Sequence, residues 1–116
     1  MTRYSCAVAL SEQVFQILLS LAAGDRHGYA IIQDVAARTS GGTRLTASTL
    51  YAVLKRLLDA GWIEEIDAPR GSVDTRRRHY RITKAGERAG RAEAARLEAL
   101  AALARDRRWL PRRAGR

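Results

Sequence analysis

The sequence is poor in the residues on which disulfide bridges, metal centres and membrane spans depend. Cys6 is the single cysteine among 116 residues, which excludes an intrachain disulfide and a metal site built on a cysteine pair. His27 and His79 are far apart in the chain, so we expect no zinc site. The uncharged run over residues 13–24 is too short to cross a bilayer, and the N-terminus lacks the segment order of a signal peptide. We therefore expect a cytoplasmic protein without cofactor or membrane contact.

Residue patterns that support catalysis are also absent from the sequence. Serine, histidine and aspartate all occur, but none has the spacing of a nucleophile elbow or a phosphate-binding loop. The sequence contains no recognisable set of acids, bases or metal ligands. We therefore do not expect an enzyme.

Basic residues outnumber acidic ones, and nearly all of them are arginines. The 21 lysines and arginines against 12 acidic residues give a formal net charge of +9, and only Lys55 and Lys84 are lysines. Such a charge favours nucleic acid or an anionic membrane surface as a partner, although arginine-biased codon usage would also produce it. The placement is more informative, because residues 70–84 carry six basic residues against one acidic residue, a net of +5. We expect this segment to contact phosphates; the alternative is a loop that is merely solvated.

Apolar residues at three- and four-residue spacing predict three helices in the first half of the chain. They cover about residues 11–23, 28–40 and 47–60. Ser11 and Thr46 are the expected caps of the first and third helices, and glycines follow all three. The buried faces are expected to comprise Val14, Ile17, Leu18 and Leu21; Ile31, Ile32, Val35 and Ala36; and Leu50, Val53, Leu54, Leu57 and Leu58.

The third helix carries small and hydroxylated residues on its solvent side. Ser48 and Thr49 lie in its N-terminal half, Tyr51 lies at the border of the buried face, and Lys55 lies one turn further on. A helix that enters the major groove of DNA needs such a slim surface, with donors for phosphates and base edges. This pattern indicates a recognition helix.

Two short strands around a basic loop predict a β-hairpin, or wing, after this helix. Residues 62–66 alternate in hydropathy. In the second strand, Tyr80 and Ile82 are expected to face the core, and His79 and Arg81 to face solvent. The residues of the wing expected to neutralise DNA phosphates are Arg70, Arg76, Arg77 and Arg78.

A last helix is expected from about residue 83 to residue 108. Its alanines favour helix, whereas Gly86 and Gly90 weaken its first turns. A long helix at the end of a small domain has no core left to cover its apolar stripe, so we expect it to pack on a second copy of the chain. The residues of this dimer contact are expected to be Leu97, Leu100, Ala101 and Ala104.

Together these elements predict a mainly α fold with a small β-hairpin, that is, a winged helix-turn-helix with a C-terminal dimerisation helix. The expected divisions are an N-terminal arm (1–10), the winged helix-turn-helix domain (11–83), the dimerisation helix (84–108) and a basic tail (109–116). Such a fold binds double-stranded DNA through its third helix and its wing.

Three blocks of the sequence resemble the PadR family of transcriptional regulators. They are "ILLSLAAGDRHGYAI", "LTASTLYAVLKRLLDAGWIEE" and "RRHYRITKAGERA". The shared pattern consists of Gly-Tyr in the second helix, Thr-Leu-Tyr at the start of the third, Leu-x-x-Gly-Trp-Ile at its end and Tyr-x-x-Thr-x-x-Gly after the wing. The resemblance covers about residues 14–90, and the short C-terminal part is similar to the small subfamily with a single C-terminal helix.

The resemblance implies a homodimeric, sequence-specific DNA-binding repressor whose C-terminal helix supplies the dimer interface. It implies that Ser48, Thr49, Tyr51 and Lys55 lie at the DNA surface. It also implies an aromatic small-molecule effector near the dimer interface, where Trp109 would line the pocket or simply anchor the partner chain.

Several other residues have plainer interpretations. Tyr29 is expected to pack between the first two helices, and Gly28 to let the backbone turn there. His27 is expected to be an exposed polar residue, and Trp62 to fill the core under the wing. His79 either touches phosphate or faces solvent.

A second class of function remains open at this stage. Some winged helices bind proteins and not DNA, and a basic surface could grip an acidic protein partner. A selection of preferred DNA sequences distinguishes the two classes, because an interaction module yields no enriched operator.

Overall fold

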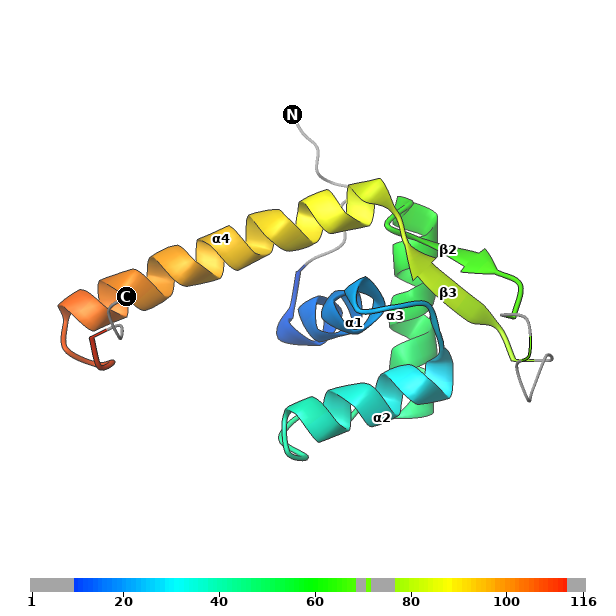
Figure 1. The fold of residues 1–116 in the computed structure, drawn as a ribbon, viewed down its shortest axis with the longest axis horizontal. Helices are drawn as coiled ribbons and strands as arrows, with labels where there is room; N and C mark the ends of the chain where they lie inside the picture. Colours follow the sequence, from blue (N-terminus) through cyan, green and yellow to red (C-terminus); the bar gives the residue numbers. More distant parts are fainter. Residues whose placement is uncertain (1–9, 69–70, 72–76, 113–116) are drawn as a thin grey trace.

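A computed structural model describes residues 10–68, 71 and 77–112 of the chain. In this part of the chain, the first three helices pack beside a small sheet, and the last helix extends away from the body (Figure 1). None of the helices described is both long enough and apolar enough to span a membrane. The elements in chain order are α1 (Glu12–Ala22), β1 (Arg26–His27), α2 (Gly28–Arg38), α3 (Ala47–Ala60), β2 (Ile63–Ile66), β3 (His79–Ile82) and α4 (Lys84–Asp106).

The caps expected from the sequence begin α1 and α3. The hydroxyl of Ser11 accepts a hydrogen bond from the backbone N–H of Val14, and that of Thr46 accepts one from Thr49. Each cap satisfies an N–H that the helix itself leaves unpaired. At the other end of α3, Gly61 adopts a left-handed conformation with φ of 78°, which a side chain would disfavour. The predicted bounds of α3 are confirmed.

The core lies where α1, α2 and α3 meet the sheet. The predicted apolar faces are buried, apart from Leu58, Ile32 and Ala36, which are half-buried. Trp62 is also half-buried and packs against the core, as expected. Leu45, from the loop before α3, joins the core as well. The buried apolar residues are Val14, Ile17, Leu18, Leu21, Ile31, Val35, Leu45, Leu50, Val53, Leu54, Leu57, Ile63 and Tyr80.

The sheet has three antiparallel strands in the order β1-β3-β2, so the predicted hairpin gains a strand. Arg26 and His27 pair with Tyr80 and His79 of β3. The two residues of β1 are too few to show an alternating pattern in the sequence. Their pairing fixes the start of α2 against the base of the wing.

The joint between the sheet and α4 is closed by Thr83. Its hydroxyl accepts a hydrogen bond from the Gly86 N–H at 3.1 Å, which caps α4, and donates one to the Gly61 carbonyl at 2.7 Å. Its backbone N–H donates to the Trp62 carbonyl at 2.9 Å. One residue thus ties the end of α3 to the beginning of α4.

The C-terminal half of α4 is largely exposed among the residues that the structure describes. At 1.5 Å per residue, its 23 residues span about 35 Å, and its far end projects beyond the other helices (Figure 1). Leu97, Leu100 and Leu103 are 39%, 51% and 47% exposed. The predicted apolar stripe is therefore present, and the described residues of the chain leave it uncovered.

Candidate nucleic-acid interface

The solvent side of α3 has the composition expected of a recognition helix. Ser48, Tyr51 and Lys55 are exposed, and Thr49 is half-buried. Residues 48, 51 and 55 recur at helical spacing, so they share one face. The Thr49 hydroxyl accepts a hydrogen bond from the Thr46 hydroxyl at 3.0 Å, which fixes the first turn of α3.

Lys55 is the basic residue of this face. Its ammonium group lies 3.3 Å from the carboxylate of Asp59, one turn further along α3, and both side chains are more than two-thirds exposed. Such an exposed pair contributes about 0.3–0.5 kcal/mol. A DNA phosphate can therefore replace Asp59 as the partner of Lys55 at little cost.

The wing places two of its four predicted arginines beside α3. Arg77 and Arg78 are exposed immediately before β3, whereas Arg70 and Arg76 lie outside the described residues. The Arg78 guanidinium lies 3.7 Å from the Glu65 carboxylate on β2. The Arg77 guanidinium lies over the Tyr29 ring, 5.5 Å from its centroid. Arg77 and Arg78, at the base of the wing, thus place two cations next to α2 and α3.

Arg81 belongs to the same strand but is bound within the protein. Its guanidinium donates to the Asp25 carboxylate at 3.1 Å and lies 3.9 Å from Glu64. The hydrogen bond and charge of Asp25 raise the pKa of Arg81 above its ordinary value. These two carboxylates offset its charge, so Arg81 is a weaker candidate for DNA contact than Arg77.

The helices α2 and α3 meet closely at Gly28. A methyl group on Gly28 would lie 2.6 Å from the Tyr51 hydroxyl oxygen, so glycine is needed for space. The chain does turn from β1 into α2 at Gly28, as expected, but the φ of Gly28 is not positive, so glycine is needed here for space and not for its conformation. The expectation that Tyr29 packs between α1 and α2 is wrong, since its side chain is 54% exposed. Tyr29 instead joins the surface beside α3.

Both histidines have structural roles that the sequence did not reveal. His27 is half-buried and caps α2, because its Nδ1 accepts a hydrogen bond from the Ala30 N–H at 3.1 Å. His79 was expected to face solvent, but it is only 4% exposed. Its Nδ1 lies 3.0 Å from the Arg77 carbonyl, to which it can only donate. The two rings meet edge to face at 5.3 Å, so contacts between β1 and β3 bury His79.

A hollow of about 520 Å³ lies at this meeting point of α2, α3 and the wing. We call it the tyrosine–arginine hollow. It is lined by His27, Gly28, Tyr29, Tyr51, Arg77 and Arg78. Burial raises the pKa of Tyr80, a core residue of β3, above its ordinary value.

The predicted dimer residues lie on α4, away from this surface. Leu97 and Leu100 are exposed, and Ala101 and Ala104 are half-buried. Trp109 follows α4 and is 80% exposed. It lines a hollow of about 510 Å³ with Leu100, Leu103, Ala104 and Arg107.

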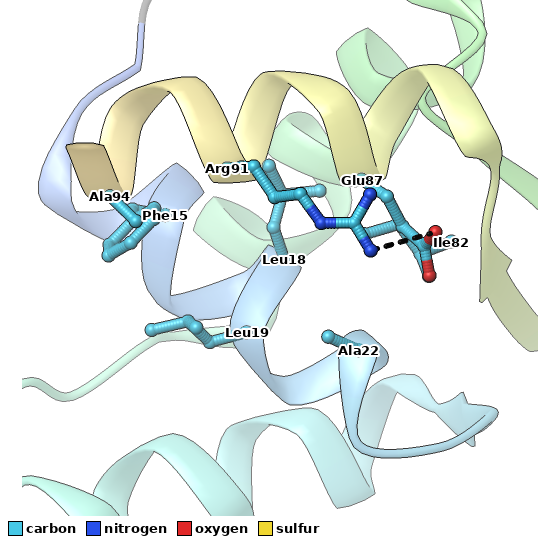
Figure 2. Close-up of a pocket in the computed structure, with 9 residues that line it drawn as sticks. Phe15, Leu18, Leu19, Ala22, Ile82, Glu87, Arg91 and Ala94 are labelled. Carbon is cyan, nitrogen blue, oxygen red and sulfur yellow. Dashed lines mark ion pairs between the residues drawn. The ribbon is translucent and has the colours of Figure 1, made fainter. Parts of the chain in front are cut away.

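A third hollow, a mostly apolar cleft of about 310 Å³, lies between α1 and α4 (Figure 2). Phe15, Leu18 and Leu19 of α1 line one side, and α4 closes the other. The Arg91 guanidinium lies 3.8 Å from the Glu87 carboxylate in the cleft wall (Figure 2). The cleft therefore lies where the winged helix domain meets α4, the helix that carries the exposed stripe.

Residues 17–92 match the sequence profile of the PadR-like family of transcriptional regulators. The chain belongs to this family. The four-part pattern of the sequence acquires a physical meaning within the PadR-like fold, because its parts meet in pairs. The Gly-Tyr and Thr-Leu-Tyr parts meet where Gly28 accommodates the Tyr51 hydroxyl, and the last two parts meet where Thr83 and Gly86 contact Gly61 and Trp62.

The sequence is also similar to that of an uncharacterized protein of Lysinibacillus sphaericus, with 40% identity over 65 residues. The match covers 54% of this chain and 57% of that protein, so this chain spans little more than half of the length of that relative.

Solved structures share the fold. A transcriptional regulator from Clostridium thermocellum is 26% identical, with a TM-score of 0.68 over 80% of this chain and 89% of the other. A PadR family regulator from Clostridium difficile is 21% identical, with a TM-score of 0.71 over 83% and 97%. PadR of Bacillus subtilis, in complex with operator DNA, is 21% identical, with a TM-score of 0.60 over 91% of this chain and 50% of that protein. The winged helix-turn-helix architecture is thus confirmed.

Proposed function

We propose that this PadR-like protein is a homodimeric transcriptional repressor that binds one preferred DNA sequence. The observation that carries the proposal is the surface of α3, where Ser48 and Tyr51 are exposed next to the arginines at the base of the wing. That surface is narrow enough for a major groove, and its neighbours are cationic enough for the adjoining phosphates. Operator DNA bound to the B. subtilis PadR structure, which shares this fold, supports the same use here.

In this proposal each part of the interface has a separate task. Ser48 and Thr49 contact base edges, Lys55 contacts a phosphate, and the wing arginines contact the backbone beside the groove. The exposed stripe of α4 pairs two copies of the chain. A two-fold dimer presents two copies of α3, so the operator is an inverted repeat whose half-sites lie about 34 Å apart.

Selection from random duplexes tests sequence specificity directly. One enriched inverted repeat is expected. Ser48→Ala should change the preferred bases more than the overall affinity, whereas Lys55→Ala should weaken binding to every duplex and flatten the log-log salt slope by about one unit. Arg88→Ala, which removes an exposed charge from α4, serves as the control and should change neither quantity.

If no sequence is enriched, the proposal fails in favour of a winged helix that grips an acidic protein partner. Repression itself is tested with a reporter gene behind the selected operator. Expression should fall when the protein is supplied and should recover with Lys55→Ala. A rise in expression would identify an activator.

We extend the proposal to regulation by an aromatic small molecule. The α1–α4 cleft is mostly apolar, and a ligand there would change the angle at which α4 leaves the winged helix domain. Because α4 sets the distance between the two copies of α3, that change would release DNA. Displacement of labelled operator by a panel of aromatic acids and amines tests this. Leu19→Trp, which enlarges an exposed side chain of the cleft wall and fills the cleft, should abolish the response. A response that survives this substitution would point to the hollow beside Trp109 instead.

A further inference from the structure

We propose that the tyrosine–arginine hollow is a binding site for a single phosphodiester group of the DNA backbone, flanking the bases that α3 contacts. The inference rests on the proposed function. It assigns a role to Tyr29 and Arg77, which lie outside α3, together with Tyr51. Its ligand is defined by chemistry: a tetrahedral monoanion with oxygens that accept several hydrogen bonds.

The lining of the hollow is selective for an anion. Two tyrosines and two arginines line it, and none of the residues that line it is acidic. Tyr29 and Tyr51 are 54% and 50% exposed, so both side chains are accessible to a ligand. The hollow also lies at the first turn of α2, where the helix dipole is positive. All these features favour the binding of one negatively charged group in the hollow.

Arg77 is held in place before any ligand arrives. One of its guanidinium nitrogens lies 3.4 Å from both ring nitrogens of His27. The same guanidinium lies over Tyr29, and buried His79 fixes the Arg77 carbonyl. A preorganised arginine loses less conformational entropy on binding than a mobile one. His79 is therefore a positioning residue for Arg77.

Tyr51 connects this hollow to the recognition helix. It lies one turn from Ser48 and one turn from Lys55 on α3, and its hydroxyl reaches over Gly28 at the start of α2. A phosphate held by the Tyr51 hydroxyl is therefore adjacent to the bases that the exposed side of α3 contacts. This position favours a backbone phosphate over a free anion as the ligand.

Gly28 offers a way to move the Tyr51 hydroxyl without removing it. A methyl group on Gly28 would lie 2.6 and 3.0 Å from the hydroxyl oxygen and ring carbon of Tyr51, which belong to an exposed side chain that can swing away. It would also lie 3.2 Å from Cδ2 of buried Leu50, which must shift slightly. Gly28→Ala should therefore displace the hydroxyl from the hollow, at some cost in stability that Tyr51→Phe does not share. Its effect on DNA binding should match that of Tyr51→Phe.

The experiment measures binding of the full chain to its selected duplex by fluorescence anisotropy. Tyr51→Phe and Gly28→Ala should each weaken binding about three- to tenfold, as expected for one hydrogen bond. The double variant should be no weaker than either single one. Arg77→Ala should weaken binding and flatten the salt slope by about one unit. Thermal unfolding of each variant verifies the fold.

A scan of the duplex with single neutral methylphosphonates locates the ligand. At one position, the methylphosphonate should weaken binding of the wild-type protein and of Ser48→Ala. The same methylphosphonate should weaken binding of Tyr51→Phe little further. If every position affects wild type and Tyr51→Phe alike, the hollow holds no backbone phosphate, although DNA binding stands. If no duplex binds at all, the proposed function fails first.

Inorganic phosphate, titrated at constant ionic strength and followed by amide NMR shifts, distinguishes a free anion as the source. We expect no saturable shift of the Gly28 and Tyr29 amides at millimolar phosphate. Saturable binding that Tyr51→Phe abolishes, combined with unchanged DNA affinity of that variant, would overturn the proposal and make the hollow a site for free phosphate.

Discussion

At the scale of single residues, the two glycines at the start of α4 have opposite roles. A methyl group on Gly86 would lie 2.1 Å from the Trp62 carbonyl oxygen, whereas one on Gly90 would meet nothing within 4 Å. Gly86→Ala must push α4 away from the backbone of Trp62, and we expect it to lower the free energy of unfolding by about 3 kcal/mol. Gly90→Ala should raise it by about 0.5–1 kcal/mol, since alanine favours helix.

Urea unfolding followed by circular dichroism measures both changes. The pair is well matched, because both glycines lie in the same helix and receive the same substitution. Equal effects of the two substitutions would show that helix propensity, and not the close approach to Trp62, determines the stability of this joint.

Burial of apolar residues was predictable from the sequence, whereas the roles of several polar residues were not. The spacing of Leu50, Val53 and Leu57 identifies a buried face because it depends on one helix alone. Burial of His79 depends on pairing with β1, some fifty residues earlier in the chain. The exposure of Tyr29 and the space requirement at Gly28 likewise depend on contacts between elements. Sequence periodicity carries no information about such contacts.

At the scale of elements, Thr83 follows β3 and connects it to the end of α3 and the beginning of α4. Its hydroxyl caps α4 and donates to the Gly61 carbonyl at the end of α3. Thr83→Val keeps the shape of the side chain but loses both hydrogen bonds, so we expect the free energy of unfolding to fall by about 2 kcal/mol. Thr83→Ser keeps the hydroxyl and should lose less than about 0.5 kcal/mol. Chemical denaturation compares the three proteins, and equal losses in both variants would refute the role of the hydroxyl.

The prediction of elements succeeded where local signals mark both ends. For α3, a capping threonine and a left-handed glycine bracket an apolar stripe, and all three are visible in the sequence. The two-residue strand β1 has no such marks, because only its pairing with β3 defines it. Of the four predicted wing arginines, Arg77 and Arg78 lie in the described surface next to α3, while the contribution of Arg70 and Arg76 stays a prediction.

At the scale of the whole molecule, α4 is the helix whose apolar side chains stay exposed among the described residues of one chain. Its apolar side chains lie beyond the core, and contiguous exposed apolar surface is characteristic of an interface. The opposite ends of the molecule thus have different chemistry: cationic donors at the wing and leucines along α4. A second copy that covers the leucines leaves both cationic surfaces available to DNA.

Charge reversal on the stripe separates pairing from DNA contact. Leu97→Glu combined with Leu100→Glu should give a monomer by analytical ultracentrifugation, because repulsion and desolvation oppose burial of four carboxylates at a two-fold interface. Affinity for the inverted repeat should fall at least about tenfold, since the second half-site no longer binds intramolecularly. Affinity for a duplex with a single half-site should stay unchanged. Ala102→Glu adds a charge to the opposite side of α4 and should remain dimeric. A double variant that is still dimeric would show that the interface lies elsewhere.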